Sequence, residues 1–316
     1  MRIGGLYKCA ALGAALLLTT LIVSCGGGSM ASSNTPASSP ATSTPTTAQA
    51  MVVVVMEENH SFEQVIGNAA MPYLNNLAHG GALATQYYAT MHPSISNYFM
   101  LTTGAPQTND NNFPGPVSAD NLARELIAAG KTWKVYAEDL PSVGYVGTSV
   151  GNYIKHHNPF AYFDSVLNST TQKANIVPFS QFASDLSNNA LPNYAFVVPS
   201  NIHNGHDCPD GTNNCTLATK LIGIDNWLSA NVGPVAQNST FMSNGVLVVT
   251  FDESAIDNTN GGGKIAVVIA GGNIKTGFQS TTKYQFENLL RFTMDRLGVP
   301  SPGAGASAAN MSEFVK

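Results

Sequence analysis

The sequence predicts a three-layer α/β/α fold with a mainly parallel central sheet. Two observations support this prediction. Five apolar runs contain consecutive β-branched residues rather than the apolar–polar alternation of half-exposed strands, as expected for strands that are buried on both faces. Stretches of helical character lie between these runs, so helices would cover both faces of the sheet.

The expected strands and helices alternate along the chain. The strands are the β-branched runs MVVVVM (51–56), TWKVYAE (132–138), YAFVVP (194–199), GVLVVTF (245–251) and KIAVVIAG (264–271). The helices cover residues 71–79, 95–103, 118–130, 216–231 and 284–298. Ser118 or Asp120 can cap the helix at 118–130, and Gly130 can close it.

Length and composition suit one large domain at residues 51–316. The chain has 316 residues, of which 44% are hydrophobic and 10% are charged, so a substantial core is possible. The formal net charge is −5 and the chain has no basic run. Nucleic acid is therefore not an expected partner, and we expect a monomer.

Residues 1–24 have the pattern of an export signal. Arg2 and Lys8 precede the apolar run AALGAALLLTTLIV, which is too short for a comfortable membrane span. Ser24-Cys25 and the following glycines resemble the bacterial lipobox, in which Cys25 would be lipidated and become the new N-terminus. The alternative is an ordinary secretory signal with a chance cysteine. We expect an exported cell-envelope lipoprotein that Cys25 anchors to the membrane.

Residues 25–50 are rich in Gly, Ser, Thr and Pro. Such a segment cannot bury apolar surface, so we expect a flexible spacer. It would hold the domain away from the membrane.

Cys208 and Cys215 lie close together in the stretch CPDGTNNC. Outside the cytoplasm, a local disulfide that closes this loop is expected. A metal-binding pair is the alternative, but no third soft ligand lies nearby in the sequence.

Two predicted strands, far apart in the chain, end in a pair of acidic residues. Glu57-Glu58 follows the first strand, and Asp252-Glu253 follows the fourth. A third polar cluster, NIHNGHD (201–207), follows the third strand. Because ligands gather beyond the carboxyl ends of strands in such sheets, we expect these groups to meet at one rim.

A divalent cation would stabilise such a meeting of carboxylates, because they repel each other and are costly to bury. The candidate oxygen ligands are Glu58, Asn59, Asp252 and Glu253. These ligands suit a hard or borderline metal, and an imidazole from His203 or His206 would shift the preference toward zinc, iron or manganese. The alternative is a set of separate, solvated surface loops.

Ser94 lies in the stretch HPSISNYFMLTTG (92–104). Because Pro93 disfavours helix before it, Ser94 is expected near a helix N-terminus, where backbone N–H groups and the dipole favour anions. One interpretation is a simple helix cap, for which Ser96 is another candidate. Beside a metal, however, Ser94 could ionise and act as a nucleophile.

Six motifs occur in the order found in the bacterial phosphoesterase family of secreted acid phosphatases and phospholipases C. They are ENHSF (58–62), HPSISNY (92–98), KTWKVYAEDLP (131–141), HNPF (157–160), HNGHD (203–207) and TFDE (250–253). The chain resembles the short acid phosphatases, some of which act on phosphoinositide head groups. The resemblance implies an alkaline-phosphatase-like fold and a phosphoesterase catalytic domain at 51–316.

The resemblance also implies a role for individual residues. The implied metal ligands are Glu58, Asn59, Ser94, Asp252 and Glu253. Ser94 would be the nucleophile that is transiently phosphorylated, and His206 would be a second catalytic residue. The implied substrate-binding residues are Asn59, His157, His203 and Asp207. Where some relatives have a histidine this chain has Lys283-Tyr284-Gln285, which favours one divalent metal ion over two.

These roles predict a metal-dependent phosphomonoesterase that hydrolyses small-molecule or lipid phosphate esters through a phosphoserine. Two alternatives remain open. A phosphodiesterase or phospholipase C would use the same metal and nucleophile and would need only room for a second ester group. A tethered lipoprotein could instead bind a phosphorylated ligand without turnover, but it would have no need for Ser94 among the metal ligands.

Overall fold

The structure, a computed structural model, describes residues 50–212 and 214–316. These residues belong to one unit, Thr47–Lys316. The predicted signal at 1–24, the lipidation candidate Cys25 and the spacer before residue 50 lie outside the described residues. No helix in the described ranges has the length and apolar character needed to cross a membrane.

Within the described residues, eight strands form one sheet in the order β4-β3-β5-β1-β6-β7-β2-β8. Their bounds are β1 (Met51–Glu57), β2 (Ala82–Tyr88), β3 (Trp133–Ala137), β4 (Ile176–Pro178), β5 (Tyr194–Val198), β6 (Gly245–Phe251), β7 (Lys264–Gly271) and β8 (Phe278–Ser280). Neighbouring strands are parallel except at β7, which is antiparallel to both β6 and β2. The predicted mainly parallel sheet is confirmed.

All five predicted strands are present, and each end lies within one residue of its predicted position. The three strands that were not predicted have weak patterns. β4 and β8 have three residues each. β2 contains the partly exposed Thr85 and Gln86, and its pairing with β7 shifts register between Ala84 and Tyr87.

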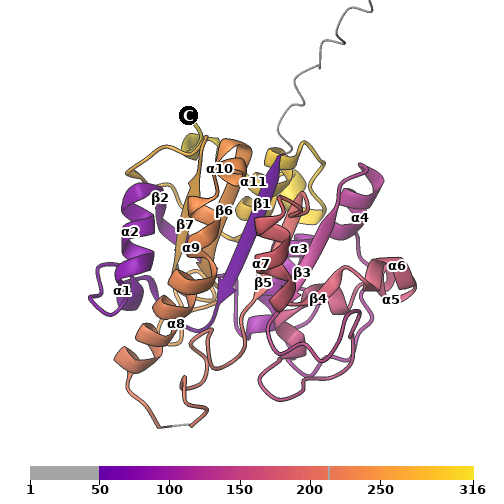
Figure 1. Ribbon diagram of the computed structural model, residues 1–316, viewed down its shortest axis with the longest axis horizontal. Helices are drawn as coiled ribbons and strands as arrows, with labels where there is room; N and C mark the ends of the chain where they lie inside the picture. Colours follow the sequence, from indigo (N-terminus) through magenta and orange to yellow (C-terminus); the bar gives the residue numbers. More distant parts are fainter. Residues whose placement is uncertain (1–49, 213) are drawn as a thin grey trace, which may run out of the picture. The chain divides into compact units, whose positions relative to one another are not determined.

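Helices pack on both faces of the sheet (Figure 1). The α-helices are α1 (Phe62–Val65), α2 (Pro72–Gly80), α3 (Ser94–Thr103), α4 (Leu122–Ala128), α5 (Asp164–Leu167), α6 (Thr170–Lys173), α7 (Ser180–Ser187), α8 (Leu217–Asn231), α9 (Gly233–Gln237), α10 (Ser239–Asn244) and α11 (Phe286–Leu297). The short 3₁₀ helices are η1 (Lys155–His157), η2 (Pro159–Ala161), η3 (Gly303–Ala306) and η4 (Ser312–Phe314). In Figure 1, α2 and α7 to α10 lie in front of the sheet, and α3 and α11 pack together behind it.

Helix α4 begins later than expected. Its cap is Asn121, whose side chain accepts a hydrogen bond from the Arg124 N–H at 3.0 Å, and not Ser118 or Asp120. The residues before it stay extended because the Val117 N–H donates to the Tyr162 carbonyl at 2.8 Å. After the helix, Gly130 adopts a left-handed φ of 67°, in line with its expected role in ending α4.

The core of the sheet holds the candidate site in place. Val52 to Val55 of β1 are almost fully buried between β5 and β6. The register continues past the strand ends, where the Asp252 N–H donates to the Glu57 carbonyl at 2.9 Å. The residues that follow β1 and β6 are therefore neighbours at the same rim of the sheet.

Cys208 and Cys215 form a disulfide, which confirms the predicted pairing. It closes a short loop, from Cys208 to Cys215, within the connection between β5 and α8. This loop begins just after the polar cluster at 201–207.

Candidate active site

Three carboxyl groups gather at the carboxyl ends of β1 and β6. They belong to Glu58, Asp252 and Glu253, which are all buried. Asn59 joins the two strand ends, because its backbone N–H donates to Asp252 Oδ1 at 2.9 Å and its side-chain amide donates to Glu58 Oε2 at 2.9 Å. Asn59 has a left-handed φ of 57°, a conformation that Asn adopts more readily than most residues.

Ser94 is the first residue of α3 and is 4% exposed. Its hydroxyl donates to Glu58 Oε2 at 3.4 Å and also interacts with the carboxylates of Asp252 and Glu253. The structure therefore brings the predicted nucleophile and the five predicted metal ligands into one cluster. We call Glu58, Asn59, Ser94, Asp252 and Glu253 the carboxylate cluster.

The electrostatics of the carboxylate cluster favour a bound cation. Burial raises the pKa of Asp252 to about 6 and that of Glu253 to about 9, and the charge of Asp252 adds to the shift of Glu253. Burial and the charge of Asp252 raise the pKa of Glu58 well above its ordinary value. Among the described residues, no Lys or Arg forms an ion pair with these three groups.

The donor atoms also fit a cation. Asp252 Oδ2 is buried and has no hydrogen-bond partner within the described part of the chain. In those same ranges no three His, Cys, Asp or Glu side chains could hold a metal by themselves, so a site here would need the Ser94 hydroxyl and the Asn59 amide as well. Carboxylate, amide and hydroxyl oxygens are the donors of a hard or borderline divalent ion.

The sequence reasoning missed two residues that hold Glu253. His92 Nδ1 lies 3.0 Å from Glu253 Oε2, and the Asn97 amide lies 3.5 Å from the same oxygen. Asn97 also binds the Met91 carbonyl at 2.7 Å, so it fixes the segment that leads into Ser94. Both residues belong to the motif HPSISNY, and the i, i+3 spacing of Ser94 and Asn97 places them on one helix face.

Tyr98 and His157 support Glu58 from the protein interior. The Tyr98 hydroxyl donates to Glu58 Oε1 at 2.6 Å. His157 is stacked on the Tyr98 ring, and its Nε2 lies 3.1 Å from Glu58 Oε1 without forming a hydrogen bond. Burial lowers the pKa of His157 well below its ordinary value, which favours the neutral ring. The structure places the predicted substrate ligand His157 behind Glu58, where it is 1% exposed.

His206 and Asp207 form a pair at the rim. His206 Nδ1 lies 2.8 Å from Asp207 Oδ1, and the Asn201 amide donates to Asp207 Oδ2 at 3.0 Å. The His206 side chain is 48% exposed. A pocket of about 400 Å³ is lined by His206 and by Asn59 of the carboxylate cluster.

His203, which the sequence offered as a substrate-binding residue or metal ligand, pairs with Glu138 instead. Its Nδ1 lies 2.9 Å from Glu138 Oε1 and Oε2, and this hydrogen bond raises the pKa of His203. Glu138 directly follows β3 and also accepts from the Trp227 indole at 3.3 Å. No contact recorded between described residues joins His203 to the carboxylate cluster.

Glu57 lies apart from its neighbour Glu58. Both of its carboxylate oxygens are buried and lack hydrogen-bond partners among the described residues. Burial, with the charge of Glu138, raises its pKa well above the ordinary value. Because side chains alternate along a strand, Glu57 and Glu58 point to opposite faces of the sheet.

The first turn of α3 already uses two of its N–H groups. The Ile95 N–H donates to Asn111 Oδ1 at 3.2 Å, and the Ser96 N–H donates to the Pro93 carbonyl at 3.2 Å. The Ser96 hydroxyl donates to the Thr108 carbonyl at 2.7 Å and does not cap the helix. The expected anion site at the helix start is therefore partly occupied by the chain itself.

Glycines bring the loop after β6 against the segment before Ser94. The Ala89 N–H donates to the Gly263 carbonyl at 2.9 Å, and the Gly262 N–H donates to the Ala89 carbonyl at 3.0 Å. Gly261 has a φ of 113°, and a Cβ there would lie 1.9 Å from the Thr90 carbonyl oxygen. Only glycine allows this approach.

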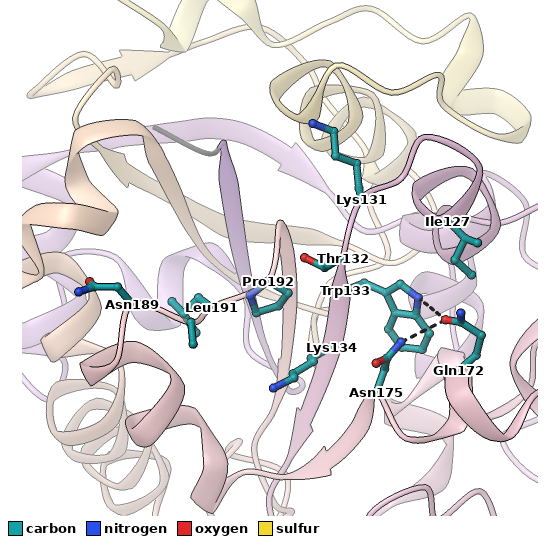
Figure 2. A pocket seen from close by; sticks show the side chains of 11 residues that line it. Ile127, Lys131, Thr132, Trp133, Lys134, Gln172, Asn175, Asn189, Leu191 and Pro192 are labelled. Carbon is teal, nitrogen blue, oxygen red and sulfur yellow. Dashed lines mark hydrogen bonds between the residues drawn. The ribbon is translucent and has the colours of Figure 1, made fainter. Parts of the chain in front are cut away.

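A larger pocket, of about 520 Å³, lies at the opposite end of the sheet (Figure 2). It opens where β3 and β5 begin and is lined by residues such as Lys131, Trp133 and Pro192. Figure 2 shows the Trp133 indole and the Asn175 amide donating to Gln172 Oε1, each at 3.1 Å. None of the predicted site residues lines this pocket.

The fold is that of the alkaline-phosphatase-like enzymes. The structure resembles the lipoteichoic acid synthase LtaP of Listeria monocytogenes, with a TM-score of 0.57 and 11% identity over 80% of this chain and 73% of that one. It also resembles a phosphonate monoester hydrolase of Agrobacterium radiobacter, with a TM-score of 0.56 and 15% identity over 84% of this chain and 77% of that one. A Vibrio parahaemolyticus protein of the alkaline phosphatase superfamily gives a TM-score of 0.55 at 15% identity, covering 84% of this chain and 72% of that one.

Within this class, the chain belongs to the phosphoesterase family, whose model matches residues 68–262. It is 32% identical to an acid phosphatase of Aspergillus fumigatus over 274 residues, which cover 82% of this chain and 57% of the relative. It is also 32% identical to a phosphatidylinositol-3-phosphatase of Mycobacterium tuberculosis over 261 residues, which cover 82% of this chain and 80% of the relative. The chain thus spans less than two thirds of the first of these relatives. The predicted family resemblance is confirmed.

Proposed function

We propose that the chain is a metal-dependent phosphomonoesterase of the acid phosphatase type, which works through a phosphoserine at Ser94. One observation carries this proposal: the Ser94 hydroxyl contacts a buried cluster of carboxyls and lies 3.4 Å from Glu58 Oε2. Among the described residues, no Lys or Arg forms an ion pair with these carboxyls. Relatives named acid phosphatase and phosphatidylinositol-3-phosphatase support phosphoester hydrolysis.

One divalent cation would complete the site. The residues that would hold it are Glu58, Asn59, Ser94, Asp252 and Glu253. When bound, such an ion lowers the pKa of a coordinated hydroxyl and offsets the charge on phosphoryl oxygens.

Ser94 is the nucleophile in this proposal. Its place at the start of α3 puts its oxygen where the helix dipole favours negative charge. The Ser94 hydroxyl first releases its proton to water; the ionised oxygen then attacks phosphorus in line, the bond from Ser94 Oγ to phosphorus forms, and the bond to the leaving alcohol breaks. Asn97 and the loop at 261–263 hold the segment before Ser94, so the hydroxyl is positioned before substrate arrives.

His206 supplies the proton to the departing alcohol. Asp207 engages Nδ1, which leaves Nε2 to exchange a proton with a ligand in the pocket beside Asn59. In the second half of the reaction, His206 Nε2 takes a proton from water, the water oxygen attacks phosphorus, and the bond to Ser94 Oγ breaks to release phosphate. His157 serves as a neutral support for Glu58 and His203 as a partner of Glu138, so we assign substrate binding to Asn59 and His206, with Asp207 orienting His206.

We further propose that this monomeric enzyme is exported and anchored at Cys25, so that it acts on small-molecule or lipid phosphate esters at the cell envelope. The support is the signal-like pattern of residues 1–24 together with the spacer composition of residues 25–50. Labelling with a radioactive fatty acid, in wild type and Cys25→Ser, tests the anchor.

Phosphate release after chelation tests the catalytic proposal. The purified protein is stripped of metal and assayed on p-nitrophenyl phosphate with Mg²⁺, Mn²⁺, Zn²⁺ or Ca²⁺ added singly. Ser94→Ala should lower kcat by about a thousandfold or more, and acid quenching during turnover should trap phosphate on wild type alone. Ser96→Ala, on the same helix, is the matched control and should keep its activity. Full activity of Ser94→Ala would remove Ser94 from the mechanism.

A further inference from the structure

The pocket of about 400 Å³ beside the carboxylate cluster has one Lys or Arg among its described wall residues, Lys220. We propose that Lys220 determines specificity by binding a second anionic group on the alcohol of the substrate. This inference rests on the proposed phosphomonoesterase activity. It names the preferred substrate class as monoesters whose leaving alcohol carries a further phosphate or carboxylate.

The pocket adjoins the carboxylate cluster at Asn59. Asn59 lines it and also donates to Glu58 Oε2 at 2.9 Å, the same oxygen that accepts from Ser94. His206, the proposed proton donor to the leaving alcohol, lines the pocket as well. In this proposal, a phosphoryl group at Ser94 has its alcohol portion beside Asn59 and His206, on the way to the rest of the pocket.

Four segments of the chain build the walls. The lining residues are Asn59, His60, Gln64, Gly205, His206, Leu217, Lys220 and Ala255. Gly205 has a φ of 91°, and a Cβ there would lie 2.5 Å from Ile224 Cδ1 and 2.9 Å from His60 Cε1. Glycine is therefore required at this position, and the wall between His60 and His206 is closely packed.

Lys220 is held in place and forms no direct ion pair with a described residue, although its charge acts on Asp207 from a greater distance. Its Nζ donates to the His206 carbonyl at 2.5 Å, which uses one of its three donors. None of the ion pairs between described residues includes Lys220. The neighbouring carboxylate, Asp207, is engaged by His206 and by the Asn201 amide.

The other polar wall groups suit an anion too. Gln64 Oε1 accepts from the Ser61 N–H at 2.9 Å, so the Gln64 amide presents its N–H₂ donors elsewhere. Lys220 is half-buried, and a charge-assisted hydrogen bond in such a setting is stronger than one in open water. An alcohol with a neutral end would leave the ammonium group without an anionic partner.

Two matched substrates test the proposal. Propane-1,3-diyl bisphosphate and 3-hydroxypropyl phosphate have the same reacting end and differ in the charge of the far end. The specificity ratio is kcat/KM for the bisphosphate divided by kcat/KM for the monophosphate, halved for the two equivalent phosphoryl groups. Wild type should give a ratio of about ten or more, and added NaCl should reduce it.

Variants assign the ratio to Lys220. Lys220→Gln, which can still donate to the His206 carbonyl, should lower the ratio about tenfold, and Lys220→Arg should keep most of it. Lys131→Met, in the pocket at the opposite end of the sheet, should leave both rates unchanged. Because both rates come from one preparation, the ratio does not depend on the fraction of folded enzyme.

The experiment distinguishes failure of the Lys220 role from failure of the proposed phosphomonoesterase activity. A wild-type ratio near one, or an unchanged ratio in Lys220→Gln, would overturn the role of Lys220 and leave the phosphomonoesterase intact. Release of phosphate from neither substrate, nor from p-nitrophenyl phosphate, would overturn the proposed function and this inference with it.

Discussion

The backbone N–H of Asn59 donates to Asp252 Oδ1 at 2.9 Å, across 193 positions of the chain. This bond fastens the carboxyl end of β1 to that of β6, and the left-handed φ of Asn59 makes it possible. The same residue holds Glu58 through its side chain. Asn59 is thus both a bridge within the carboxylate cluster and a position whose left-handed backbone few other residues would tolerate.

Substitution of Asn59 should separate its two roles. Asn59→Ala loses the amide and places a less tolerant residue at φ 57°, so the free energy of unfolding should fall by about 1–3 kcal/mol. Asn59→Gly accepts the backbone conformation and should be less destabilised, yet it should be as inactive as Asn59→Ala. Urea unfolding and phosphate release measure the two effects. Equal stability of the two variants would argue against backbone strain at this position.

Tyr98→Phe should weaken the site without emptying the core. The change leaves Glu58 Oε1 without its 2.6 Å donor in a buried setting, which costs about 1–3 kcal/mol of unfolding free energy. Tyr145→Phe is the control, because its exposed hydroxyl bonds only to the Thr148 carbonyl and its loss should cost within about 0.5 kcal/mol. Chemical denaturation gives both values, and equal losses would mean that the Tyr98 hydroxyl does not stabilise Glu58.

The pair of His203 and Glu138 should make stability depend on pH. The hydrogen bond that His203 donates to Glu138 raises the pKa of His203, so this contribution is complete below about pH 6.5 and is lost as pH rises through the higher folded value. Burial raises the pKa of Glu138, but hydrogen bonds from His203 and Ser200 outweigh it, and the net pKa is lowered. That contribution is present above about pH 4.3 and is lost as pH falls through the lower folded value.

The stabilisation by this pair is therefore greatest between about pH 4.3 and 6.5. Glu138→Gln should lower the thermal midpoint more at pH 5.5 than at pH 9, because His203 is neutral at the higher pH. Melting curves of wild type and variant across this range provide the measurement. A midpoint difference that does not change with pH would show that His203 gains no charge in the folded protein.

Gly261→Ala should disturb the segment that leads to Ser94. A Cβ at this position meets the Thr90 carbonyl oxygen at 1.9 Å, so the loop must move or the backbone must strain by about 1–3 kcal/mol. Gly151→Ala is the comparison: Gly151 also has a positive φ, of 57°, but has open space around it, so the change should cost less. Thermal melting and kcat of both variants test this, and normal kcat in Gly261→Ala would show that the contact does not position Ser94.

Metal removal should lower stability as well as activity. Three buried carboxyls without a cation must hold protons or repel each other, so chelation should lower the thermal midpoint and re-addition should restore it. A ligand at a hundred times its dissociation constant stabilises by about 2.7 kcal/mol. Asp252→Asn should reduce this gain, whereas Glu63→Gln, at an exposed carboxylate, should retain it. No midpoint change with any divalent ion would count against the metal site.

Much of the fold follows from local sequence. The β-branched runs at β1, β3, β5, β6 and β7 are long enough to predict strands, because no helical spacing competes with them. The antiparallel direction of β7 is not encoded in that pattern, since a buried strand has the same composition in either direction. The cysteine spacing likewise predicted the disulfide, because the two residues are near neighbours in the chain.

The components of the active site could be chosen from the sequence, because polar groups at the ends of apolar strands are costly unless they serve a ligand. Only the tertiary structure decided which groups meet. The alternation of side chains along a strand places Glu57 and Glu58 on opposite faces, but it does not show which of them faces Ser94. Nor does the sequence of α3 show that Asn111 already accepts a hydrogen bond from the Ile95 N–H. His157 and His206 both belong to short motifs that contain His and Asn. His157 nevertheless packs behind Glu58, whereas His206 lines the pocket. The reason is that such contacts depend on sheet register and packing between distant segments, which local sequence does not specify.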